Sequence, residues 1–451
     1  MANTAIDTEE GSLLKKIVFY SIPLVFSGVL QLLFNAADLV IVGRYCGHIY
    51  VGAVGATSSL IHLIVGLFMG LSVGAGVRVA HGIGANDTEE IHKTVHTAIP
   101  AAIICGIILT VIGVLFSTNF LQLMETPKEV LPLSSLYMRI YFLGITANMI
   151  YNFGAAILRA AGNTRGPLYY LTAAGVLNVI LNIIFVKAFN MNVDGVAWAT
   201  AISQCLSAAL VIISLMRRDD ACRFELRKMK IYKDTLVRIL EIGVPAGIQG
   251  SLFSISNVII QSSVNSFGDM AVSGSSAASN IDGFVFVAMN ALHQAAMNFV
   301  GVYYGAKKYE QIGKIMRICL ISVFVVGAVL GGGVYLFAPQ LLSIYITDSA
   351  AAIGYGIIRM KYVCLFEALD GMMDVMTGVL RGMGSSVAPM IITVLGVCVF
   401  RVTWVYTVFR MFNTFEALLV SYPISWILTF SVQFIAYIMI RKKQMTLPEG
   451  N

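Results

Sequence analysis

Charged residues are scarce in this chain, and their scarcity excludes an ordinary soluble domain. Of the 451 residues, 12% are charged and 58% are hydrophobic, and the mean hydropathy is +0.82. A soluble domain carries roughly 25% charged residues, because its surface must face water. The composition therefore predicts a polytopic membrane protein with almost no soluble domain.

Disulfide spacing and catalytic motifs are also missing. The seven cysteines, an odd number, lie mostly in apolar runs, so we expect free thiols that pack as small apolar groups. No zinc-protease motif, nucleophile elbow or ATPase signature occurs, and the glycines between 70 and 84 lack the setting of a phosphate loop. We therefore expect neither an enzyme nor a cofactor, and an ion gradient as the energy source. No small-residue cleavage site follows the first apolar run, so we expect no signal peptide.

Long apolar runs are what the chain has in abundance. A hydrocarbon core about 30 Å thick needs about 20 apolar residues per helix, and alternating strand patterns are absent. The sequence therefore predicts an all-α polytopic membrane protein with twelve transmembrane helices. The expected spans are 17–43, 51–78, 94–117, 135–158, 167–187, 195–215, 236–264, 277–301, 314–338, 355–380, 389–409 and 417–440.

Basic residues are distributed unequally between the two sides of these helices. The N-terminal tail, the connections after even-numbered helices and the C-terminal tail hold 22 of the 30 Lys and Arg residues. The positive-inside rule therefore predicts a multi-pass protein of the inner (plasma) membrane with both termini in the cytoplasm. The net charge of +6 suits anionic membrane lipids, so we expect no nucleic-acid partner.

The chain repeats itself at a nearly constant offset. Three separated pairs of segments lie 221 or 222 residues apart: Leu158-Arg159-Ala160-Ala161-Gly162 and Leu380-Arg381-Gly382-Met383-Gly384, Gly84-Ala85 and Gly305-Ala306, and Pro23 with Asn35 and Pro245 with Asn257. Six helices per copy give two parallel bundles with a cavity between them, a common transporter plan. The predicted domains are an N-terminal cytoplasmic tail (1–16), an N-lobe with helices one to six (17–215), a cytoplasmic linker (216–235), a C-lobe with helices seven to twelve (236–440) and a C-terminal cytoplasmic tail (441–451).

A few polar side chains fall at membrane depth, where each is costly unless it is paired or hydrated. Asp38 lies in the first helix, and Asn178 and Asn182 share a face of the fifth at i, i+4 spacing. Asp370 and Arg401 fall at about the same depth, which permits an ion pair. Two alternatives stay open: Asp38 could be a snorkelling or capping residue, and Asp370 could serve only a structural ion pair.

The order and symmetric placement of these motifs resemble the bacterial multidrug and toxin extrusion (MATE) transporters over about residues 15–440. The motifs that carry the resemblance are Asn35-Ala36-Ala37-Asp38, the two Gly-Ala pairs, Leu158-Arg159-Ala160-Ala161-Gly162-Asn163, Asn178 with Gly195-Val196-Ala197, and Leu380-Arg381-Gly382. The resemblance implies a monomeric secondary antiporter that exports cationic or amphipathic small molecules by rocker-like alternating access, in exchange for protons or sodium ions.

The resemblance also implies roles for individual residues. Asp38 matches the coupling aspartate of helix one, with Asn178 and Thr200 as its polar partners. Asn182 stands where relatives often carry a second carboxylate, which weakens the case for sodium there and leaves Asp38 able to titrate. Asp370 matches the aspartate of a second, C-lobe cation site, but Phe253 stands near the place of that site's glutamate. A sodium ion near Asp38 or Asp370 is thus an expectation of the resemblance.

The substrate is expected between the lobes, near Phe34, Asn35, Asn257 and Glu367. A flippase for lipid-linked precursors shares this general plan and is the alternative function. Flippases usually place several cationic residues in the central cavity, and here only Arg401 and Lys361 are candidates.

Overall fold

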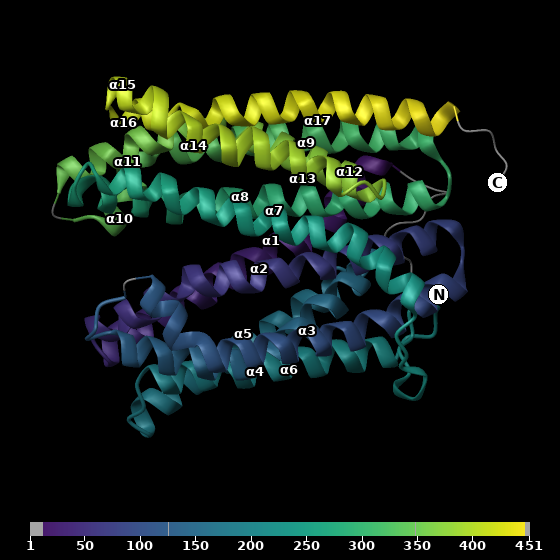
Figure 1. Cartoon of the computed structure of the whole chain (residues 1–451), viewed down its shortest axis with the longest axis horizontal. Coiled ribbons are helices and arrows are strands. Elements are labelled where there is room, and N and C mark those ends of the chain that lie inside the picture. Colours follow the sequence, from purple (N-terminus) through teal and green to yellow (C-terminus); the bar gives the residue numbers. More distant parts are fainter. Residues whose placement is uncertain (1–11, 125, 348, 447–451) are drawn as a thin grey trace. The chain divides into compact units, whose positions relative to one another are not determined.

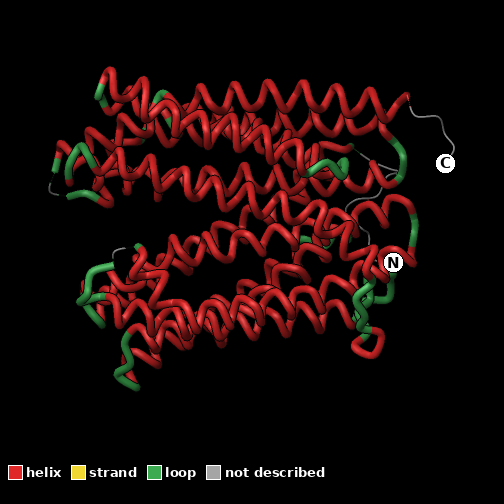
Figure 2. Tube along the Cα trace, in the orientation of Figure 1, coloured by secondary structure: helices red, strands yellow, loops and turns green. Residues whose placement is uncertain are grey.

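The computed structural model describes residues 12–124, 126–347 and 349–446, and within these ranges the chain is helical with short loops and contains no strand (Figures 1 and 2). The predicted all-α class is confirmed. The α-helices are α1 (Leu13–Tyr45), α2 (His48–Ala85), α3 (Thr88–Leu123), α4 (Leu131–Ala160), α5 (Arg165–Ile183), α6 (Val193–Met216), α7 (Lys233–Asn265), α8 (Asp269–Gly305), α9 (Tyr309–Leu336), α10 (Ala338–Tyr345), α11 (Ala350–Tyr362), α12 (Glu367–Gly382), α13 (Val387–Thr393), α14 (Phe400–Trp404), α15 (Arg410–Phe412), α16 (Phe415–Leu419) and α17 (Ser421–Thr446).

Eleven helices in the described ranges are long and apolar enough to cross a membrane. The remaining expected span, 355–380, the tenth along the chain, is not one continuous helix as predicted. It is divided into α11 and α12 by a 3₁₀ turn at Cys364–Phe366. Gly331 of α9 lies against this break, where a Cβ atom would stand 2.0 Å from the carbonyl oxygen of Cys364. The break thus allows two backbones to approach closely.

The duplicated sequence reappears in the backbone. The described residues with positive φ fall into four pairs, each separated by 221 to 223 residues: Gly47 and Gly268, Asn86 and Lys307, Gly162 and Gly384, and Asn190 and Asn413. A left-handed residue ends a helix by turning the chain away from its axis. The final glycine of the repeated Leu-Arg motif, with φ of 81° in both copies, therefore ends α4 and α12 in the same way.

The contacts divide the chain into two compact units. The first contains residues 26–251, and the second contains the start of α1 up to Val25 and residues from Leu252 onward. Both divisions fall inside helices, shortly after Pro23 in α1 and Pro245 in α7. The lobe boundaries expected from the repeat lie elsewhere, and they stay a prediction.

Glycines bring α2 and the first half of α7 into backbone contact within the first unit. Gly70 and Gly74 of α2 face Gly243 and Gly247 of α7. A Cβ at Gly247 would lie 2.0 Å from the carbonyl oxygen of Leu67, and one at Gly70 would lie 2.2 Å from the nitrogen of Gly247. Helices in membranes often pack through small residues at this four-residue spacing. We call these four residues the glycine seam.

The segment between α6 and α7 is docked on the beginning of α3. His96 donates its Nδ1–H to the carbonyl of His92 (2.9 Å), so its Nε2 accepts the backbone N–H of Glu225 (3.1 Å). The Tyr232 N–H donates to Thr97 Oγ1 (3.2 Å). Cys222 is buried nearby, at 3% exposure. The segment is therefore held by specific hydrogen bonds, although its composition is that of a basic linker.

Candidate functional site

Four of the predicted coupling residues form one chain of hydrogen bonds in the first unit. Asn182 Nδ2 donates to Asp38 Oδ1 (2.6 Å) and to Asn178 Oδ1 (3.2 Å). Asn178 Nδ2 in turn donates to Thr200 Oγ1 (3.3 Å), and that hydroxyl donates to the carbonyl of Val196 (3.0 Å). The structure therefore brings Asp38, Asn178, Asn182 and Thr200 together from α1, α5 and α6.

Local helix geometry explains how these side chains meet. Asn178 and Asn182 are one turn apart on α5, so both amides point toward α6 and α1. A π-helical turn, Ile184–Ala188, follows directly after α5. Such turns widen a helix and frequently occur at functional sites.

Asn182 has unused hydrogen-bonding capacity. Its side chain is fully buried, and its Oδ1 atom has no hydrogen-bond partner. A buried acceptor without a donor costs about 1–3 kcal/mol. Asn182 therefore holds a free acceptor close to a carboxylate, an arrangement suited to a proton or a cation.

The sequence did not single out Tyr137 of α4, whose electrostatic interaction with Asp38 places it near this group. Tyr137 is buried at 7% exposure and belongs to an apolar run, so hydropathy alone gives no signal for it.

Phe34 packs its ring against Gly175 of α5, where a Cβ would lie 1.9 Å from the ring.

The second unit contains a different polar group around the break between α11 and α12. The thiol of Cys364 donates to Asp282 Oδ1 (3.3 Å), and Arg359 Nη1 donates to Ser275 Oγ (2.9 Å). Glu367 and Asp370 begin α12 and are 2% and 7% exposed. Glu367 Oε2 is buried without a hydrogen-bond partner.

Arg401 and Asp370 do not form the predicted ion pair in this structure. The ion pairs within 4.0 Å among the described residues do not include them. Arg401 Nε instead donates to Ser425 Oγ (2.9 Å), and the guanidinium lies over the ring of Tyr422 at 4.1 Å. The equal depths of the two residues were no measure of side-chain direction, because Arg401 turns toward α17.

The other expected substrate and ion residues are less connected. Asn35 and Asn257 are exposed, each on a helix of a different unit, so their role in a cavity stays a prediction. The described ranges contain no group of three or more His, Cys, Asp or Glu side chains arranged to hold a metal ion. A sodium ion near Asp38 or Asp370 would therefore depend on amide, hydroxyl or backbone oxygens as well.

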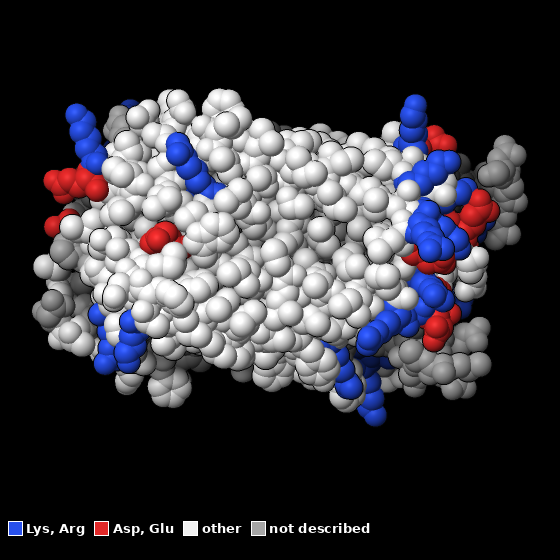
Figure 3. All heavy atoms as spheres, turned by 90° about the horizontal axis from the view of Figure 1, so that it is seen from below, with Lys and Arg blue, Asp and Glu red and all other residues white. Residues whose placement is uncertain are grey.

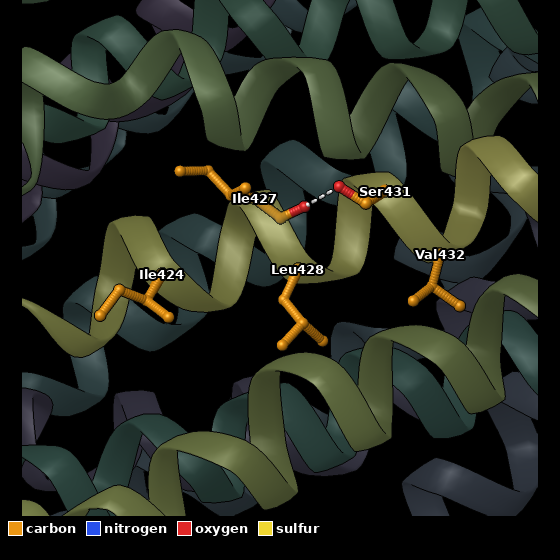
Figure 4. Close-up of a pocket in the computed structure, with 5 residues that line it drawn as sticks. All are labelled: Ile424, Ile427, Leu428, Ser431 and Val432. Atoms are coloured by element: carbon orange, nitrogen blue, oxygen red, sulfur yellow. Dashed lines mark hydrogen bonds between the residues drawn. The ribbon is translucent and has the colours of Figure 1, made fainter.

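An apolar hollow on α17 is lined by Ile424, Ile427, Leu428, Ser431 and Val432 (Figure 4). The Ser431 hydroxyl donates to the carbonyl of Ile427 (2.7 Å), one turn earlier in its own helix. The wall therefore offers no charge and little polarity to a ligand, and we do not count it as part of the functional site.

Comparison with known proteins identifies the chain. The MatE family model matches residues 23–184 and again residues 245–407. The chain belongs to the MATE family. The double match has the spacing of the internal repeat, so each copy is one MATE module.

Relatives of this MATE protein include proteins named for multidrug resistance and multidrug export. The chain is 26% identical to the probable multidrug resistance protein YoeA of Bacillus subtilis over 86% of its length and 85% of the relative's. It is 22% identical to the multidrug export protein MepA of Staphylococcus saprophyticus, over 88% of both chains. The fold matches an outward-facing multidrug resistance MATE transporter with a TM-score of 0.90 and 23% identity, covering 97% of this chain and 98% of the other. The chain is thus a multi-pass membrane protein of a multidrug efflux family.

Proposed function

We propose that this MATE protein is a secondary antiporter that exports cationic or amphipathic small molecules in exchange for protons or sodium ions, by rocker-like alternating access of its two lobes. The observation that carries the proposal is the hydrogen-bond chain from Val196 through Thr200, Asn178 and Asn182 to Asp38. It ends on the only acidic side chain of α1 within the described residues, and intramembrane carboxylates of this kind mark ion pathways.

The direction of the donors suggests how Asp38 would respond to a proton. The ionised carboxylate accepts a hydrogen bond from the Asn182 amide. A protonated Asp38 would need an acceptor, and Asn182 can supply its free Oδ1 after the amide turns over. Proton uptake would therefore exchange donor for acceptor at Asn182 and change the packing of α1 against α5. This is the kind of local two-state event that can bias a larger conformational change.

A proton is the coupling ion that the site favours. Asp38 is the one carboxylate of the hydrogen-bond chain, and its direct partner is the neutral amide of Asn182. A sodium ion would be held by several oxygen ligands, and one negative charge provides weak attraction for it. The lone carboxylate suits a site that binds and releases a single proton.

The two prolines support the rocking part of the proposal. Pro23 and Pro245 interrupt the backbone hydrogen bonding of α1 and α7, and each lies close to the point where its helix passes from one unit to the other. Proline is the commonest cause of a helix kink. These points would serve as hinges when the lobes move.

We also propose that both termini lie in the cytoplasm of a cell whose plasma membrane holds the protein. Most of the surface drawn in Figure 3 carries neither basic nor acidic side chains. The scarcity of charge on this surface supports a membrane-spanning protein, and the excess of Lys and Arg in the two tails and in the connections after even-numbered helices supports a cytoplasmic position for both termini.

Efflux from cells tests the role of Asp38. Asp38→Asn keeps the size of the side chain and removes its charge, so we expect loss of drug resistance and of dye efflux in a susceptible host. Asp194→Asn is the matched control, because Asp194 accepts the backbone N–H of Asn192 at the start of α6 and has no place in the hydrogen-bond chain. Full efflux by Asp38→Asn at equal membrane abundance would refute the coupling role.

A further inference from the structure

Arg401 is a fully buried cation with spare hydrogen-bonding capacity. Its side chain is 1% exposed in α14, and its Nη2 atom has no hydrogen-bond partner. A buried charge costs several kcal/mol unless it is paired and its donors are satisfied. The single bond to Ser425 leaves most of the guanidinium donors available.

Aromatic rings surround this guanidinium. Its central carbon lies 4.1 Å from the ring centroid of Tyr422, 5.5 Å from that of Trp426 and 6.0 Å from that of Phe253. The indole Nε1 of Trp426 is also buried without a partner. Arg and Trp side chains can only donate hydrogen bonds, so two neighbouring donor groups in this cluster lack an acceptor.

The carboxylates of α12 do not supply that acceptor. Asp370 and Glu367 interact electrostatically with Arg401, but no carboxylate oxygen lies within 4.0 Å of its nitrogens in the described residues. In the second unit, Arg401 and the carboxylates of Asp370 and Glu367 thus interact electrostatically but form no ion pair within 4.0 Å. A ligand that carries a hydrogen-bond acceptor could therefore accept from Arg401 Nη2 or Trp426 Nε1.

The helix around Arg401 is irregular on both sides. π-helical turns occupy Val394–Val399 and Val405–Phe409 and leave only the five residues of α14 between them. Inserted residues of this kind re-aim side chains and recur at functional sites. The segment that positions Arg401 is therefore flanked by two departures from α-helical geometry.

We propose that Arg401 and Trp426 form a subsite for the carboxylate of an aromatic substrate. The guanidinium and the indole N–H would donate to the two carboxylate oxygens, and the aromatic part would stack on Tyr422 or Phe253. The subsite is closed in this conformation, so those two rings must move aside for a ligand to enter. The proposal rests on the transport function proposed above and extends its substrates from cations to aromatic carboxylates.

A pair of probes of equal shape tests the subsite. Binding of naphthalene-2-carboxylate and of the neutral naphthalene-2-carboxamide is measured by calorimetry on the purified full chain in nanodiscs at pH 7.5. We expect the carboxylate to bind at least about tenfold more tightly, because a charge-assisted bond to guanidinium exceeds a neutral one. Arg401→Gln should abolish this preference, Arg401→Lys should retain part of it, and Trp426→Phe should weaken it.

The control is Arg410→Gln, which removes an exposed guanidinium that also lies over a tyrosine, Tyr406, at 5.3 Å. This variant should keep the full preference. Equal affinity of the wild type for both probes, or an unchanged preference in a monodisperse Arg401→Gln protein, would overturn the subsite. Wild-type protein that exports a cationic dye but does not distinguish the probes would leave the transport function intact. Wild-type protein that exports no dye would contradict the transport function itself.

Discussion

The glycine seam between α2 and α7 gives a prediction whose size follows from the structure. Gly247→Ala adds one methyl group at a point 2.0 Å from the carbonyl oxygen of Leu67. An ordinary contact is 3.4 Å or more, so the two backbones must separate by about 1.4 Å (3.4 − 2.0) at this point. The obstacle is a backbone atom within a helix, which cannot rotate away as a side chain can.

Overpacking of this kind costs about 1–3 kcal/mol. For a unit of this size, each kcal/mol lowers the unfolding temperature by about 2–4 °C. We therefore expect Gly247→Ala to lower Tm by about 5 °C, measured by differential scanning fluorimetry of the purified protein in detergent.

Gly250→Ala is the matched control on the same helix, because a Cβ at Gly250 meets nothing within 4 Å. Alanine is favoured over glycine in a helix by up to about 1 kcal/mol, so this variant should unfold at the wild-type temperature or slightly above it. If both variants had the same Tm, or if Gly247→Ala were as stable as the wild type, close packing at the seam would be refuted.

Two further predictions concern the docked linker. Burial and the nearby charge of Asp220 raise the pKa of Cys222 to about 12, so alkylation of this thiol at pH 7.5, followed by mass spectrometry, should be slow. His96→Phe removes the acceptor of a linker N–H and should speed the alkylation about tenfold, whereas His92→Phe should not. Equal alkylation rates in the wild type and both variants would contradict the docking. Burial opposes ionisation of Asp220, but hydrogen bonds from Arg218 lower its pKa below the ordinary value. The stabilisation by ionised Asp220 is therefore present above about pH 4 and is lost as pH falls through the lowered pKa. The wild type should have a higher Tm than Asp220→Asn at neutral pH, and this difference should disappear at about pH 2. A difference that persisted at that pH would contradict the stabilising role of the Asp220 carboxylate.

The repeat was the part of the fold that the sequence predicted best. Turn residues such as Gly162 and Gly384 can be recognised in the sequence, and each copy of the repeat has a residue with positive φ there to end its helix. The break at Cys364–Phe366 was not predictable by hydropathy, because those residues are as apolar as a helix interior. The break lies against the backbone of Gly331 in α9, and hydropathy carries no information about such a tertiary contact.

The candidate site, like the fold, could be predicted only in part. Asp38, Asn178 and Asn182 could be grouped from helical spacing and family resemblance, and the structure joins them by hydrogen bonds. The partners of Arg401 could not be predicted, because they depend on the rotation of an irregular helix between two π-helical turns. Depth along a helix can be read from residue number, whereas the direction of a side chain depends on the surrounding packing.

The most direct test of the account is dye transport in proteoliposomes under a proton gradient and a sodium gradient, each imposed separately. We predict that the proton gradient drives transport by the wild type, that the sodium gradient alone does not, and that Asp38→Asn responds to neither. Transport by Asp38→Asn at the wild-type rate would contradict the claim that Asp38 couples ion movement to export.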